Sequence, residues 1–470
     1  MRTTTLFVTC ALALLCGCQT PQVRRTPALP AAPKQSSLSD SAQETMQKPV
    51  IQPVQHIEAV QPPVPEPVQL PPAKLKPVQV GALTLADLEQ MALSANPSVA
   101  RAAALVEAAR GNWVQVGLPP NPSVGYEGQQ IGSGGRAEQD GVFVEQEFVR
   151  GGKLTLNRNV AAQEVARAEH QLAAQQQRVL TDVRIAFYQV LIAQRQEALT
   201  LELRNIAAEG VKTAEALQRG KEVGKVDVVQ AQLELENVEI LVENARNRSR
   251  AAWQTLASVV GNPQLRPQPL DGEIDEVRPS LDWQTSLERL LSSSPEIAAA
   301  VADIERARWA AERARVEKTP NVTVQGLVNW RDNGIGGDPD GGITVGLPIP
   351  LWDRNQGGIV RAAQEAAAAE QALQQLELSL QNRLAPVFER YANALHQVTK
   401  YRTRILPAAQ QSLELQRQSY EVGESGYVSL LTAQRTFSQT NLNYLESLRE
   451  LRAAEAQIEG LLLSGSLENR

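Results

Sequence analysis

Apolar residues keep a helical spacing along an unusually long stretch of this chain. From Leu156 to Arg219 there is no proline and a single glycine, and apolar side chains recur every three or four positions on a background rich in Ala, Gln and Glu. Roughly 60 helical residues at about 1.5 Å each make a rod of about 90 Å, which is too long for a compact domain. A turn at Gly220–Val226 follows, and a second helix returns to Gly261. The pattern predicts a long helical hairpin over 153–261.

The hairpin is duplicated. The stretch GKVDVVQAQ at 224–232 returns as GYVSLLTAQ at 426–434, and each copy lies at a turn between two helices. A second hairpin is therefore predicted over 356–463. Its long helix contains Pro386 and Pro407, and we expect a kink or break at each.

Shorter helices open each half. Thr84, followed three residues later by Asp87, has the form of a capping box, and the helix that it starts is predicted to run through a break at Asn96-Pro97 to about Val116. Ser294-Pro295 is the corresponding break in the second half. The chain therefore reads as two internal repeats, predicted at 81–263 and 281–463.

Between the opening helices and the long helices the period changes from 3.6 to 2, which indicates strands. The strands are predicted at about 122–130 and 141–149 in repeat 1, and at about 321–331 and 341–350 in repeat 2. Each pair is joined by a glycine-rich loop, as in a β-hairpin. Every strand has one mainly apolar and one mainly polar side. In the second strand Val142, Val144 and Phe148 lie opposite Glu145 and Glu147.

Four such strands have the length and alternation of outer-membrane barrel strands. Four cannot close, and an open sheet edge is not tolerated in lipid because its N–H and C=O groups are unpaired. Two copies would give eight strands with a filled interior, whereas three give twelve with a lumen. The predicted fold class is mainly α with a membrane β-barrel portion: a trimeric twelve-stranded barrel continued by an α-barrel of twelve long coiled helices. Small residues such as Ala366–Ala369 would let those helices pack closely.

The amino terminus has the form of a bacterial secretion signal over 1–17. An apolar core ends in Cys16-Gly17-Cys18, which resembles a lipobox with Cys18 as the lipidated residue, a carrier of palmitate; an ordinary signal peptide with incidental cysteines is the alternative. Residue 19 is Gln and not Asp, and that sorting pattern points to the outer membrane. Residues 18–80 are rich in proline and are predicted to be the lipid anchor and a disordered tether.

Composition narrows the function classes. Aromatic residues make up only 4% of the chain, and much of the 43% hydrophobic content is alanine, which suits thin helix-on-helix packing. A net charge of −6 with no basic stripe argues against a nucleic-acid partner. No apolar run is long enough for a transmembrane helix. Because no cysteine follows Cys18, disulfides and cysteine-ligated metals are excluded from the body of the chain.

The sequence also argues against an enzyme. Its three histidines are His56, His170 and His396, and they form no HExxH motif or metal-spaced cluster. We expect His170 and His396 to be solvated helix residues. Only Met46 and Met91 follow the signal, so no soft-metal relay, and no cofactor, is expected.

Several short motifs occur in a family order. They are Leu83-Thr84-Leu85 through Asn96-Pro97, then LPIPLWDRNQG at 347–357, then Ile405-Leu406-Pro407 leading to Tyr420-Glu421-Val422-Gly423. On these residues, over about 81–463, the chain resembles the TolC-type outer-membrane factors of tripartite efflux systems. It most resembles the lipoprotein cation-efflux branch typified by CzcC and CusC, an assignment that depends mainly on PLWDRNQGG.

That resemblance implies passive export through a homotrimer in the outer membrane. A periplasmic adaptor (membrane fusion protein) and an inner-membrane RND-type pump would supply the solute, with heavy-metal cations as the expected cargo. A multidrug or other organic-solute channel of the same fold is the alternative. The resemblance also implies adaptor docking at the hairpin tips, at Gly220, Gly224, Gly423 and Gly426, and we expect these glycines to supply the positive φ that a helical hairpin needs.

Acidic residues of the second repeat narrow the periplasmic entrance in the family, but the matching positions here are Ser429 and Thr432. The acidic residue is instead Asp227 of repeat 1, with Glu222, Glu421 and Glu424 close to the tips. Three copies of Asp227 could form a cation-attracting ring. Alternatively, Asp227 only caps the returning helix.

Two further alternatives stay open. Trp330, near a strand end, belongs either to an aromatic girdle at the lipid interface or to a core packed against a loop. A periplasmic coiled-coil adaptor or structural lipoprotein would also carry a long helical hairpin, but it would lack two repeats and four amphipathic strands.

Overall fold

The computed structural model describes residues 82–129, 131, 139–276, 278–332 and 338–468. These residues belong to one compact unit, Pro72–Arg470. The predicted signal, the predicted lipidation site Cys18, the proline-rich stretch and His56 lie outside the described residues, as do most residues of the two glycine-rich loops.

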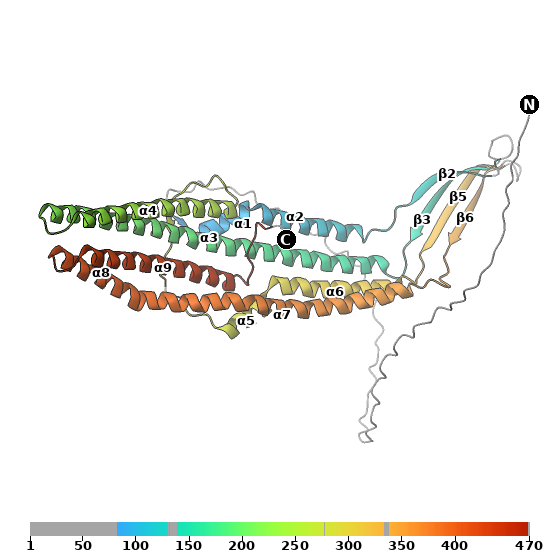
Figure 1. The fold of residues 1–470 in the computed structure, drawn as a ribbon. Coiled ribbons are helices and arrows are strands. Elements are labelled where there is room, and N and C mark those ends of the chain that lie inside the picture. The colour runs from blue at the N-terminus through green and yellow to red at the C-terminus, as the bar shows by residue number, and fades with distance from the viewer. Residues whose placement is uncertain (1–81, 130, 132–138, 277, 333–337, 469–470) are drawn as a thin grey trace, which may run out of the picture. The chain divides into compact units, whose positions relative to one another are not determined.

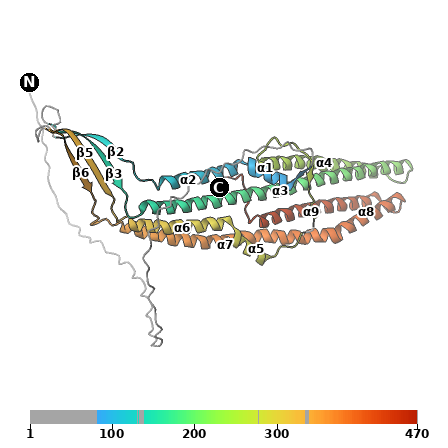
Figure 2. The same cartoon turned by 180° about the vertical axis from the view of Figure 1, so that it is seen from behind.

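Repeat 1 follows the predicted order. Its elements are β1 (Leu83–Thr84), α1 (Leu85–Ala95), α2 (Pro97–Gln115), β2 (Ser123–Gln129), β3 (Gln139–Phe148), α3 (Lys153–Arg219) and α4 (Lys225–Val260). The long helix predicted from residue 153 is α3, which runs for 67 residues without interruption. α4 returns along it, and the two lie side by side in both views (Figures 1 and 2).

The start of repeat 1 is fixed by its caps. The Asp87 N–H donates to Thr84 Oγ1 and the Thr84 N–H donates to the Asp87 carboxylate, so the predicted capping box is confirmed. Asn96 is 1% exposed. Its side chain accepts the Ser98 N–H at 2.9 Å and donates to the Val259 carbonyl at 2.7 Å. The break before Pro97 therefore also ties the opening helices to the end of α4.

Repeat 2 has the same order, except that its first long helix is divided by a π-helical turn. Its elements are β4 (Leu270–Asp271) in the connection, α5 (Trp283–Ser293), α6 (Pro295–Val316), β5 (Val322–Asp332), β6 (Asp340–Gly346), α7 (Gln356–Lys400), the π-helical turn η2 (Tyr401–Ile405), α8 (Leu406–Glu421) and α9 (Tyr427–Glu459). The strand predicted to reach residue 350 ends at Gly346. Pro348 and Pro350 have no N–H to offer a ladder, and this outweighs the continuing apolar alternation.

The two prolines of the second long helix behave differently. α7 continues as an α-helix through Pro386, so there is no break at this position, and a kink there stays a prediction. The interruption expected at Pro407 is present as η2. The Leu406 N–H donates to Tyr401 O, five residues back instead of four, directly before a proline that has no N–H.

The four long strands form one antiparallel sheet in the order β2-β3-β5-β6. β3 pairs with β5 over its whole length, from Gln139 opposite Asp332 to Phe148 opposite Val322. The two hairpins, one from each repeat, are thereby joined side by side. A separate parallel pair, β1 with β4, connects the start of repeat 1 to the segment between the repeats.

The core is distributed along the helices. One cluster packs α1, the middle of α3 and the end of α4, with Leu88, Phe187 and Leu256 at its centre. A second joins α3 to α7 and α9 through residues such as Leu203, Leu384 and Leu448. A small third cluster lies at the tips. Thin helix-on-helix packing thus replaces a thick globular core.

Candidate functional site: channel surfaces and the network that holds them

The sheet has one apolar and one acidic face. Residues that are partners across strands share a face, and the register places Val124, Val144 and Ile343 on the same side. Val124 and Ile343 are 72% and 81% exposed in the single chain. The opposite face carries Glu127, Glu145, Glu147 and Asp340.

Both edges of the sheet are open within the described chain. β2 pairs only with β3 and β6 pairs only with β5. Each edge therefore presents a row of N–H and C=O groups that require partners from outside the chain. Trp330 lies near the loop end of β5, is 51% exposed and has the Tyr126 ring 6.2 Å away between centroids. Its place in a lipid-interface girdle stays a prediction.

The first hairpin tip connects α3 to α4. Gly220 and Gly224 have φ of −71° and −81°, so neither needs to be glycine, and the positive φ belongs to Lys221 at 63°. The Glu222 N–H donates to Leu217 O at 3.0 Å, which is the bond of a Schellman helix end. The left-handed residue of this helix end is Lys221, one residue after Gly220. The expectation of positive φ at Gly220 and Gly224 was therefore wrong.

The second tip repeats this geometry with a different residue. The Glu424 N–H donates to Ser419 O at 2.9 Å, and Gly423 takes the left-handed position with φ of 75°. Gly426 has φ of −76°, so the expectation of positive φ was wrong there as well. Among the four glycines proposed from the sequence, only Gly423 has the backbone conformation that was expected.

Asp227 caps the returning helix. Its carboxylate accepts the Gly224 N–H at 3.2 Å, which satisfies a backbone donor that would otherwise be free at the start of α4. The structure therefore contains the capping contact that was one of the two interpretations of Asp227. The other, a ring of three Asp227 side chains, stays a prediction. Glu222 and Glu424 are exposed on the turns, and Glu421 pairs with Arg417 at 3.0 Å.

Two tyrosines pack beneath the tips. Tyr420 and Tyr427 are each 2% exposed, and their rings lie 5.7 Å apart between centroids. Burial raises the pKa of Tyr427 to about 12, and the nearby Glu234 carboxylate acts in the same direction. Burial, followed by the charge of Asp227, also raises the pKa of Tyr420. Both side chains therefore stay neutral at physiological pH.

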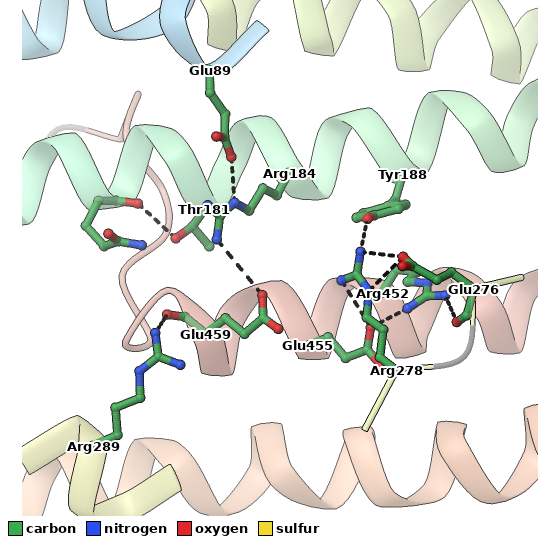
Figure 3. Close-up of polar contacts among 11 residues, drawn as sticks. Glu89, Thr181, Arg184, Tyr188, Glu276, Arg278, Arg289, Arg452, Glu455 and Glu459 are labelled. Atoms are coloured by element: carbon green, nitrogen blue, oxygen red, sulfur yellow. Dashed lines mark hydrogen bonds and ion pairs between the residues drawn. The ribbon is translucent and has the colours of Figure 1, made fainter. Parts of the chain in front are cut away.

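A buried arginine, which sequence reasoning missed, holds the connection between the repeats (Figure 3). Arg452 of α9 is 2% exposed. Its guanidinium donates to Ile274 O at 2.9 Å, also donates to Glu276 O, and pairs with Glu455 at 2.8 Å. The sequence signal was an arginine on the mainly apolar stripe of α9, three residues before a glutamate on the same stripe.

The same network reaches α3 through Tyr188. The guanidinium groups of Arg452 and Arg278 lie 5.6 Å and 5.5 Å from the centre of that ring, and Arg278 also approaches Glu455 at 3.8 Å. Nearby, Arg184 of α3 donates to Glu89 of α1 at 2.6 Å and lies 4.0 Å from Glu459 of α9 (Figure 3). Charged contacts thus connect α1, α3, α9 and the inter-repeat segment at one level of the helices.

Within the described part of the chain, no group of three or more His, Cys, Asp or Glu side chains could hold a metal ion. His170 lies on α3 and His396 on α7. None of the described helices combines the length and the apolar character needed to cross a membrane.

An open sheet with one apolar face, attached to long helical hairpins, defines a channel-forming membrane protein. The family model described as "Outer membrane efflux protein" matches residues 88–262 and 286–462. The chain therefore belongs to the outer membrane efflux protein family, whose members are channels and not enzymes. The two matched ranges correspond to the two repeats.

Individual relatives agree with this assignment. The cobalt-zinc-cadmium resistance protein CzcC of Cupriavidus metallidurans is 26% identical over 382 residues, 81% of this chain and 90% of that protein. The solved structure of CusC is similar with a TM-score of 0.65 and 18% identity, covering 81% of this chain and 92% of CusC. The open-state MtrE channel of Neisseria gonorrhoeae gives a TM-score of 0.67 and 18% identity, covering 81% and 89%. These structures share the fold.

Proposed function

We propose that three copies of this chain form a lipid-anchored outer-membrane channel that exports heavy-metal cations delivered by a periplasmic adaptor and an inner-membrane RND-type pump. The observation that carries the proposal is the open four-stranded sheet with opposite apolar and acidic faces. Three such sheets joined edge to edge close a twelve-stranded barrel, the smallest closed assembly with a lumen. Channels of this family form trimers and work with an adaptor and a pump.

The two faces then have defined environments. The apolar face, which carries Val124, Val144 and Ile343, faces lipid, and the face with Glu127, Glu145, Glu147 and Asp340 lines the lumen. Each chain contributes these four carboxylates. A lumen of this charge attracts cations and repels anions.

The choice of heavy metals as cargo is supported by similarity. CzcC, a cobalt-zinc-cadmium resistance protein by name, aligns with 81% of this chain. Selection among the metal ions would belong to the pump. Lipidation at Cys18 would add a membrane anchor to the barrel.

Growth of cells lacking this chain tests the cargo. One panel contains Zn, Co, Cd, Cu and Ag salts, and the other contains dyes, detergents and antibiotics. We expect the cells to be sensitive only to the metal panel. Reintroducing the wild-type gene should restore metal resistance. Sensitivity confined to the organic panel would still be consistent with an export channel. It would contradict heavy metals as the cargo and favour the multidrug alternative.

A further inference from the structure

A groove lies between the middle parts of α3, α4 and α9. Its volume is about 750 Å³. Sites that hold small organic molecules typically have volumes of roughly 300–1,000 Å³. Apolar side chains such as Ile192, Leu241 and Leu445 line the groove beside the charged Arg248 and Arg449. All of the lining residues belong to one chain.

Arg248 is a charged group of the groove without a counterion. Its Nη1 donates to the Gln196 side-chain oxygen at 2.8 Å. Among the described residues, no carboxylate oxygen lies within 4.0 Å of its guanidinium, and Nε and Nη2 have no hydrogen-bond acceptor. These two nitrogens form an edge of the guanidinium that can bind a carboxylate through two parallel hydrogen bonds.

The other two charges of the groove satisfy each other. Arg449 donates to the Glu446 carboxylate through Nη2 at 2.6 Å and through Nε at 3.0 Å. This pairing lowers the pKa of the Glu446 carboxyl, and the charge of Arg248 acts in the same direction. Glu446 is therefore ionised and compensates Arg449, so the positive charge of Arg248 remains available to a ligand.

The lining of the groove favours one kind of anion. A single uncompensated guanidinium matches a single negative charge, and its free edge is planar, as a carboxylate is. Gln189 and Asn244 add amide groups that have no hydrogen-bond partner in the described part of the chain. Because the walls are partly apolar, they favour a solute with an apolar body over a fully hydrated inorganic ion.

The groove lies on the side of the helices opposite to α1. Phe187 and Leu191 of α3 belong to the core cluster that packs against α1 and the segment between the repeats. The groove residues Gln189 and Ala193 lie two positions after them. Two positions correspond to about 200° around a helix. One face of the helix layer is therefore covered by α1 and the inter-repeat segment, and the groove lies on the other face.

We propose that this groove is a wall site of the export tube, in which an organic carboxylate binds with its charged group on Arg248 and its apolar body against Ile192, Leu241 and Leu445. This inference rests on the proposed trimer. Three copies of α1 and of the inter-repeat segment on the inner face would fill the tube, so these elements lie outside and the groove faces the lumen. The exported metal ions would then share the tube with organic carboxylates.

Fluorine NMR of the full trimer in detergent tests the site. The probe is para-trifluoromethylbenzoate, and the neutral para-trifluoromethylbenzamide has nearly the same shape without the charge. Wild type, Arg248→Gln and Arg250→Gln are compared. Arg250 lies two positions after Arg248, on the opposite side of α4, and pairs with Glu243 at 3.6 Å. Its replacement therefore removes the same charge from outside the groove.

We expect wild type and Arg250→Gln to bind the benzoate with equal affinity. Arg248→Gln should bind it about tenfold more weakly, because the charge-assisted hydrogen bonds are lost. Equal benzoate affinity of wild type and Arg248→Gln, or equal affinity of wild type for the benzoate and the benzamide, would overturn the site. Arg248 is exposed and glutamine is also long and polar, so the variant is expected to fold.

Single-channel current tests the position of the site in the lumen. The benzoate should reduce the current of wild type and Arg250→Gln, and should reduce that of Arg248→Gln less. Binding without any change of current would contradict a wall site. Because one chain lines the groove, binding does not depend on the trimer. Wild-type protein that binds the benzoate but neither forms trimers nor conducts would therefore contradict the proposed function and, with it, the place of the groove in a tube.

Discussion

Lys221 occupies a backbone position that glycine would fill with less strain. Its φ is 63°, whereas the same position of the second tip is Gly423 with φ of 75°. A non-glycine residue in this region costs about 1–2 kcal/mol, part of which is regained because glycine loses more freedom on folding. We expect Lys221→Gly to raise the free energy of local opening by about 0.5–1 kcal/mol, measured by amide hydrogen exchange at the first tip.

Gly423→Ala is the matched control for that substitution. An added Cβ meets nothing within 4 Å, so any loss of stability reports the backbone alone. We expect exchange at the second tip to become faster. If neither variant changed the hydrogen-exchange rates at its own tip relative to wild type, the assignment of backbone strain to the left-handed position would be contradicted.

Asp227 allows charge to be separated from capping. Asp227→Asn keeps an oxygen that can accept the Gly224 N–H but removes the charge, whereas Asp227→Ala removes both. If three Asp227 carboxylates line the entrance, both variants lower the cation selectivity of the reconstituted channel, measured as a reversal potential in a salt gradient. If Asp227 only caps α4, neither variant shifts the potential, and only Asp227→Ala accelerates exchange at the tip.

At the scale of elements, the periodicity of the chain was sufficient to predict its long helices and its four long strands. The capping box at Thr84, the break at Asn96-Pro97 and the hairpin turns are each determined by residues a few positions apart. The end of β6 and the tip glycines were not predicted correctly, because a ladder needs N–H groups that Pro348 lacks, and because the left-handed position depends on where the helix ends. The different outcomes at Pro386 and Pro407 have no local sequence signal.

The Arg452 network could not be derived from local patterns either. Its partners lie on the segment between the repeats and on α3, far away in the sequence. Only folding brings them together.

Arg452 joins elements, so its removal should loosen the contact between the repeats. Arg452→Met removes the nearer cation from the buried Glu455 carboxylate, which keeps only Arg278 at 3.8 Å, and leaves the Ile274 and Glu276 carbonyls without donors. Breaking a buried pair in this way typically costs about 3–5 kcal/mol. We expect a clearly lower thermal unfolding midpoint. The double variant Arg452→Met with Glu455→Leu removes the unpaired charge and should recover part of the loss.

A surface arginine supplies the comparison for the Arg452 variants. Arg308→Met breaks exposed contacts with Glu305 and Glu370 and should change the midpoint little. An equal shift in Arg308→Met and Arg452→Met would contradict the role given to the buried network.

At the scale of the whole molecule, the assembly decides the function. In the described part of the chain, the four long strands form a sheet with two open edges, and a bilayer tolerates neither edge. In the proposed trimer, the acidic face lines a lumen once the sheet closes, and the long hairpins form a tube together with those of the neighbouring chains.

The most direct test of the account is therefore the number of chains in the detergent-extracted particle, measured by native mass spectrometry. We predict a mass of three lipid-modified chains, and single-channel conductance from the same preparation. A monomer, or a dimer whose eight strands would leave no lumen, would contradict the channel as described.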